Sequence, residues 1–137
     1  MYNNGLASDY LKRAGSRLKA LEVLLSEESW ADVVREAQEI VEITLKALLR
    51  VCHIEVPRIH DVSPVMEQNR DRLPSEISGD RLDELARISR SLRRDRELAF
   101  YGSEDLTPSE FYTREDAATA FGQARRVYET VRAAVPI

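Results

Sequence analysis

The sequence predicts an all-α protein, an antiparallel up-and-down bundle of four long helices and one short helix. Apolar residues recur at steps of three and four along most of the 137 residues, which is the spacing of one helix face. No segment shows the alternating pattern of a strand, and no internal repeat is present. The length fits a single domain spanning residues 1–137.

The first two helices follow from this periodicity. One is expected over about residues 7–25, and the second, over 30–52, has the strongest amphipathic pattern of the chain. The second helix should therefore be central. Its polar side holds Glu42 and Lys46, an i,i+4 pair of opposite charge. Pro57 cannot continue a helix comfortably because it lacks a backbone donor.

The short helix begins after the next turn. Asp61 or Ser63 is expected to cap it, with Pro64 in its first turn, and it should run to about Arg72. A fourth helix should start near Gly79. It is expected to turn four apolar side chains inward: Leu82, Leu85, Ile88 and Leu92.

The last part of the chain is expected to be a loop followed by a helix. Residues 102–112, which include Pro108, are predicted as the loop. Thr113 and Asp116 are close to a capping box and should open the last helix. The inward positions of that helix are expected to be Ala117, Ala120, Phe121, Ala124, Val127, Tyr128 and Val131.

Composition excludes several classes of protein. The net charge of −4 argues against a protein that coats nucleic acid by bulk electrostatics, although 17 arginines against three lysines suit phosphate contacts, or simply reflect a GC-rich genome. A single cysteine, Cys52, excludes an internal disulfide framework, and two histidines without clustered partners give no metal site. No cofactor motif is present. With neither a membrane span nor a signal peptide, a cytoplasmic protein without membrane contact is expected.

The fourth helix carries an arginine ridge opposite its leucine stripe. Arg87, Arg90 and Arg94 follow steps of three and four there. Most such ridges are only solvated faces, so this one points weakly to phosphate binding.

Arg96 lies on the apolar side of the same helix, five residues before Tyr101. A guanidinium on this side needs an acceptor, since burying it unpaired is costly. In the structural interpretation Arg96 reaches solvent or pairs with a nearby acid at the bundle end, and residue chemistry alone favours this interpretation. In the functional interpretation it grips phosphate at a cleft or dimer seam, with Tyr101 donating a hydrogen bond or stacking on a base.

The order of motifs resembles the HEPN domain family, small helical proteins of prokaryotes that are often paired with minimal nucleotidyltransferases. The resemblance covers nearly the whole chain. The residues that carry it are the segment 37–49, the turn with Pro57 and His60-Asp61-Val62, the segment 94–102, Pro108, Tyr112-Thr113 and the Ala-rich last helix. It implies an antiparallel bundle of four to five helices that commonly forms a homodimer.

The resemblance implies two activities. Many members are metal-independent ribonucleases, often toxins, whose motif is an Arg followed after four to six residues by a His that transfers the proton. Other members are binding or scaffold modules. In this sequence Arg94 and Arg96 both lead to Tyr101 at that spacing, and neither His53 nor His60 follows an arginine suitably. We interpret His60 and Asp61 as a structural corner in preference to a relocated base.

The sequence therefore predicts a homodimeric HEPN-type partner of a nucleotidyltransferase in a module of toxin–antitoxin type. Arg90, Arg94 and Arg96 are the expected phosphate- or nucleotide-binding residues, and efficient catalysis is not expected. One alternative is an endoribonuclease with Arg96 and Tyr101 as catalytic residues, or with a base supplied across the dimer. Another is a purely structural interaction module. The first or the fourth helix is expected at the dimer seam.

Overall fold

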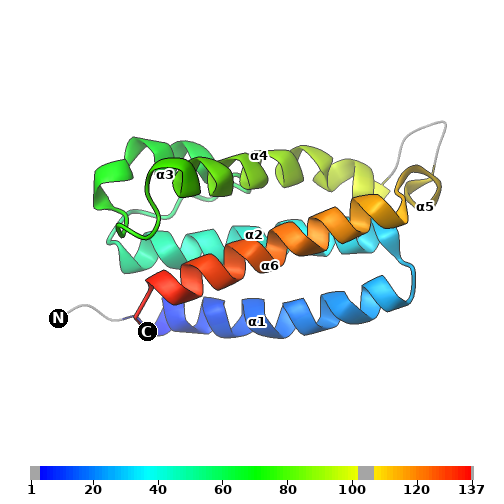
Figure 1. The fold of residues 1–137 in the computed structure, drawn as a ribbon, viewed down its shortest axis with the longest axis horizontal. Coiled ribbons are helices and arrows are strands. Elements are labelled where there is room, and N and C mark those ends of the chain that lie inside the picture. The colour runs from blue at the N-terminus through cyan, green and yellow to red at the C-terminus, as the bar shows by residue number, and fades with distance from the viewer. Residues whose placement is uncertain (1–3, 102–106, 137) are drawn as a thin grey trace.

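The computed structural model describes residues 4–101 and 107–136, with residues 95–101 described by their backbone alone. Within these residues all regular structure is helical, which confirms the predicted all-α bundle of four long helices (Figure 1). The helices in chain order are α1 (Gly5–Ser26), α2 (Trp30–Val51), α3 (Ser63–Gln68), the 3₁₀ turn η1 (Arg70–Arg72), α4 (Gly79–Tyr101), α5 (Pro108–Phe111) and α6 (Arg114–Ala134).

Helix α2 is the centre of the bundle, as its amphipathic pattern predicts. It packs against α1, α4 and α6, and consecutive long helices run in opposite directions (Figure 1). Ile40, Leu45 and Leu48 on α2 are completely buried. Because three helices surround α2, its polar side is also partly covered: Glu42 and Lys46 form the predicted pair at 2.9 Å, but their side chains are only 15% and 16% exposed.

The first two helices both end through a backbone turn in the left-handed region. Glu28 and His53 each have a φ of 60°. The next amide in each case donates back to a carbonyl of the last turn: Ser29 N to Leu24 O at 3.0 Å and Ile54 N to Leu49 O at 2.9 Å. This is the hydrogen-bond pattern of a Schellman motif. Helix α2 therefore stops well before Pro57.

The predicted capping box at the start of α6 is confirmed. The Thr113 hydroxyl accepts from the Asp116 amide at 3.2 Å, and the Asp116 carboxylate accepts from the Thr113 amide at 2.9 Å. The predicted loop before it was wrong in part. Its last residues form the one-turn helix α5, whose N-cap Thr107 accepts from the Glu110 amide, and residues 102–106 lie outside the described residues.

The inward stripe predicted for α4 is confirmed, because its members are at most 4% exposed: Leu82, Leu85, Ile88 and Leu92. The sharp entry into α4 uses Gly79, whose φ of 54° suits glycine. Within the described ranges no helix combines the length and the apolar character needed to cross a membrane.

Candidate functional site

The residues predicted to hold phosphate lie on the second half of α4. Arg90 and Arg94 are one helical turn apart and both are exposed. Arg96 and Tyr101 lie in the last two turns, where the backbone is described and the side chains lie outside the described residues. The structure thus places all four on one half of a helix and leaves the roles of Arg96 and Tyr101 as predictions.

Two ion pairs tie the α3 region to the outer face of α4. Arg90 Nη1 lies 2.6 Å from Glu67 Oε1, and Arg70 Nη2 lies 2.7 Å from Asp83 Oδ1. All four side chains are 42–57% exposed, so each pair adds little stability. Arg90 can therefore exchange Glu67 for a phosphate at small cost. Arg87 is exposed on the same ridge and forms no ion pair with the side chains described.

Asp61 fixes the turn that precedes α3. Its Oδ1 accepts hydrogen bonds from the Ser63 amide at 2.9 Å and from the Ser89 hydroxyl at 2.7 Å. The N-cap position itself belongs to Val62 and has no side-chain cap bond. The expected cap by Asp61 or Ser63 is thus corrected: the Asp61 carboxylate binds the first helical amide from one position further out, and it also reaches α4.

His60 lies beside Asp61 and contacts a half-buried carboxylate on α2. Glu42 accepts hydrogen bonds from His60 Nδ1 at 2.8 Å, Lys46 Nζ at 2.9 Å and Gln38 Nε2 at 3.0 Å. Burial acts to raise the pKa of Glu42, but the bonds from Lys46, Gln38 and His60 outweigh it, so this pKa is lowered. Glu42 is therefore a charged anchor for the turn, and the imidazole Nδ1 is occupied.

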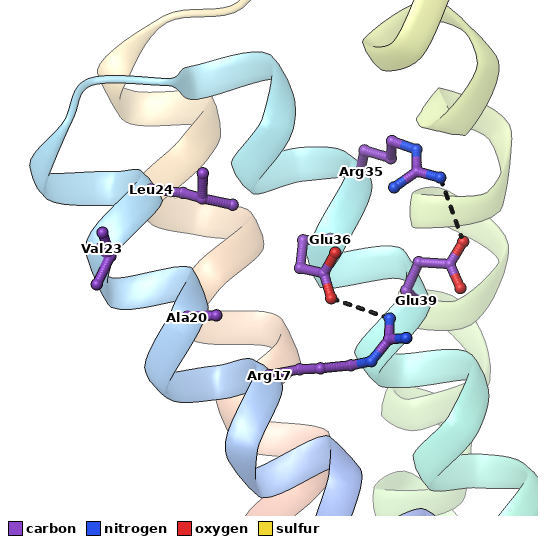
Figure 2. Close-up of a pocket in the computed structure, with 7 residues that line it drawn as sticks. All are labelled: Arg17, Ala20, Val23, Leu24, Arg35, Glu36 and Glu39. Atoms are coloured by element: carbon purple, nitrogen blue, oxygen red, sulfur yellow. Dashed lines mark hydrogen bonds and ion pairs between the residues drawn. The ribbon is translucent and has the colours of Figure 1, made fainter.

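A groove of about 740 Å³ runs between α1 and α2 (Figure 2). The α1 residues Ala20, Val23 and Leu24 supply its apolar part. Val23 is 59% exposed, which is high for a large apolar side chain. Sequence analysis missed this groove, although Val23 was an available signal, because it is two residues from the buried Leu21 and so faces away from the core.

Charged pairs of opposite sign border the groove on the α2 side. Arg17 reaches across from α1 and its Nη1 lies 3.0 Å from Glu36 Oε1 (Figure 2). Arg35 and Glu39, one turn apart on α2, form a longer pair at 4.0 Å. The groove therefore combines an exposed apolar strip with charged pairs of both signs.

The model of the HEPN domain family matches residues 7–134. The chain belongs to the HEPN domain family. No curated protein and no solved structure gives a significant match to it. Membership supports a role related to nucleotides or RNA in general.

In this HEPN chain the end of α4 and the histidines are separated. Asp61 bonds to Ser89, and Arg96 lies seven residues further along α4, an axial distance of about 10 Å at ~1.5 Å per residue. Tyr101 lies about 18 Å along the axis by the same measure. The turn that holds His60 therefore meets α4 at Ser89, well before Arg96 and Tyr101.

In the part of the chain that is described, no three His, Cys, Asp or Glu side chains are grouped as metal ligands would be. Cys52 is partly buried at the end of α2. Burial raises the pKa of its thiol despite the opposing effect of Arg72, so the reactive thiolate is disfavoured.

Proposed function

We propose that this HEPN protein binds the phosphates of RNA or a nucleotide at the C-terminal half of α4, without efficient cleavage. Arg90, Arg94 and Arg96 are the guanidinium groups of this site, and Tyr101 supplies a phenol. The observation that carries the proposal is the position of Tyr101, which follows Arg94 and Arg96 at the spacing where the family's ribonucleases have a histidine. The family model covers this part of the chain, since it matches residues 7–134.

The chemistry of these side chains favours binding over turnover. Guanidinium groups form bidentate hydrogen bonds with phosphate. Attack by a ribose 2′-hydroxyl also needs a general base whose pKa lies near the working pH. A phenol, with an ordinary pKa of about 10, is a poor base at neutral pH. A site with Arg96 and Tyr101 is therefore suited to hold a phosphate and to position it.

The test is RNA binding and cleavage by the purified protein in EDTA, with wild type beside Arg96→Ala and Tyr101→Phe. We expect no cleavage, and binding that Arg96→Ala weakens at least tenfold. Arg81→Ala, an exposed arginine at the other end of α4, is the matched control and should bind as wild type. Cleavage that Arg96→Ala abolishes would instead establish the endoribonuclease alternative, and Tyr101→Phe would then test whether the phenol carries the proton.

We also propose that the protein is the partner of a minimal nucleotidyltransferase in a module of the toxin–antitoxin type. The support is family membership together with the replaced histidine. The tagged protein, recovered from its native cells, should carry a nucleotidyltransferase identified by mass spectrometry. Recovery in which no nucleotidyltransferase is enriched over a tag-only control would contradict the partnership.

We further propose a homodimer whose seam is the α1–α2 groove. Helix α1 carries Arg13, Arg17 and Lys19 in its middle turns and Glu22 nearer its end, followed by Glu27 and Glu28 directly after the helix. Two antiparallel copies of α1 would place the basic middle turns of each copy against the acidic end of the other around a twofold axis, so the surface is complementary to itself. Ala20, Val23 and Leu24 would lie near that axis.

Sedimentation or light scattering tests this seam. Val23→Asp should convert the dimer to a monomer without loss of helical content. Ile59→Asp is a matched control, because Ile59 is 42% exposed in the turn after α2 and lies outside the groove. A dimer that survives Val23→Asp would exclude this seam and favour α4. A dimer that binds neither RNA nor nucleotide would favour the structural interaction module, the alternative that the groove itself supports.

A further inference from the structure

A second cavity lies between α1 and α6. The start of α1 and the end of α6 lie at the end of the bundle opposite the end of α4 (Figure 1). Its volume is about 240 Å³. Residues near the start of α1 and in the last turns of α6 line it: Ser8, Leu11, Lys12, Tyr128 and Arg132. Because α1 and α6 run in opposite directions, the i,i+4 pairs Ser8–Lys12 and Tyr128–Arg132 face the same space.

The Tyr128 hydroxyl lies close to Gly15, whose missing side chain leaves room for the ring. A Cβ atom at Gly15 would lie only 2.7 Å from the Tyr128 oxygen, so a larger residue would displace the ring. The same oxygen accepts a hydrogen bond from Arg132 Nη1 at 2.9 Å. A phenol that accepts in this way still has its own hydrogen to donate. Arg132 keeps further N–H groups beyond the one bonded to Tyr128.

The charge of the cavity is not balanced by its walls. Lys12 and Arg132 contribute two positive charges, and none of the lining residues is acidic. Across residues 4–94 and 107–136, no carboxylate forms an ion pair with either cation. The neighbouring acid Asp9 contacts Arg13 instead, at 3.9 Å. Two cationic and two hydroxyl-bearing residues therefore line one small space, and this donor set is complementary to an anion with several oxygens.

We propose that this cavity binds a terminal phosphate group, with Lys12 and Arg132 neutralising its charge and Tyr128 and Ser8 donating hydrogen bonds. Pockets for drug-sized molecules have about 300–1,000 Å³, so a cavity of 240 Å³ suits the phosphate and the atoms next to it rather than a whole nucleotide. The site is distinct from the proposed phosphate site on α4 and does not depend on it.

The test is titration of the full chain with inorganic phosphate, AMP and adenosine at low salt, followed by NMR of the backbone amides. Phosphate and AMP should shift the amides around Lys12 and Arg132 saturably, and adenosine should not. Lys12→Ala and Arg132→Ala should each weaken binding at least tenfold. Arg125→Ala removes one positive charge from an exposed position on α6 outside the cavity and should leave the affinity unchanged.

The affinities separate the two sources of phosphate and the two sites. Equal affinity for phosphate and AMP would show that free phosphate is a sufficient ligand. Tighter binding of AMP would show that the preferred ligand is a phosphate monoester. Either result supports a phosphate site in the cavity. Tyr128→Phe, which keeps the ring and the charge, should weaken binding several-fold. Arg96→Ala should leave these shifts intact even if RNA binding at α4 fails. Shifts that grow linearly without saturation, or that Lys12→Ala and Arg132→Ala leave unchanged, would overturn the proposal.

Discussion

The imidazole Nδ1 of His60 lies 2.8 Å from the carboxylate Oε1 of Glu42, and this contact joins the turn before α3 to the central helix. A carboxylate can only accept at neutral pH, so the imidazole donates its hydrogen here. With Lys46 and Gln38 as further donors, Glu42 collects three side-chain hydrogen bonds in a half-buried position. The His60–Glu42 pair therefore stabilises the connection between α2 and α3.

Replacing Glu42 by Gln should destabilise the fold by about 1–3 kcal/mol, because three donors lose a charged acceptor. Urea unfolding at neutral pH, followed by circular dichroism, measures this loss. Glu129→Gln, on the exposed side of α6, is the control and should change the free energy of unfolding by less than about 0.5 kcal/mol. Equal stability of the two variants would contradict the anchoring role of Glu42.

Lowering the pH should remove the difference in unfolding free energy between wild type and Glu42→Gln. The pKa of Glu42 in the folded protein is below its ordinary value of 4.5. Its charged form therefore contributes stability above that ordinary value, and the contribution is lost as the pH falls through the folded pKa. The gap between wild type and Glu42→Gln should narrow steadily below about pH 4.5. A gap of constant size from neutral to acid pH would show that the charge of Glu42 is not what stabilises the turn.

Asp61→Ala should cost about 2–3 kcal/mol, since it leaves two donors without their acceptor in a buried position. Ser63 is fully buried and Ser89 is 4% exposed, so water does not easily replace the carboxylate. Asp61→Asn keeps an acceptor oxygen and should cost less than Asp61→Ala. Thermal unfolding of both variants checks the order, and the reverse order would show that the two hydrogen bonds to Asp61 contribute little.

His53→Gly should stabilise the protein by about 1 kcal/mol, because a residue with a side chain pays a steric cost in the left-handed region that glycine avoids. Glu28→Gly makes the same backbone change but also removes the ion pair between Glu28 and Arg114 at 2.7 Å. Glu28→Gly should therefore gain less stability than His53→Gly. Chemical unfolding compares the two, and a destabilised His53→Gly variant would mean that contacts of the imidazole outweigh the backbone cost.

Gly15→Ala should destabilise the bundle by about 1–3 kcal/mol, because the new methyl group collides with the Tyr128 hydroxyl. In a Tyr128→Phe background the nearest remaining ring carbon lies 3.3 Å from the same Cβ. The alanine should then cost markedly less. A double-mutant cycle measures this coupling directly. Identical costs in the two backgrounds would show that the two helices simply move apart to accept the methyl group.

The elements of the fold follow from the sequence because each long helix carries its own apolar stripe, and α6 also carries a capping box. The capping box at Thr113 and the stripe ending at Leu92 are local patterns of this kind. The one turn of α5 is too short to show periodicity, so its N-cap Thr107 and Pro108 at its first position are the local signals for it.

The groove and the anchoring pair could not be derived in the same way. A helical wheel assigns faces to one helix at a time and does not say which polar face a neighbour will cover. Glu42 on α2 and Arg17 on α1 both lie on faces that such a wheel leaves in solvent, yet each reaches a partner on another segment. The roles of Arg96 and Tyr101 stay predictions.

The position of α2 between three other helices has a consequence for how the molecule opens. An amide near Leu45 or Leu48 can meet water only after α1, α4 and α6 separate from it, whereas α5 is a single turn of largely exposed residues. Hydrogen exchange at the middle of α2 should therefore require global unfolding, while α5 exchanges through small local fluctuations. A ligand that binds the native state should raise the opening free energy of these α2 amides by RT ln(1 + [L]/Kd). These amides therefore report on any ligand of the bundle.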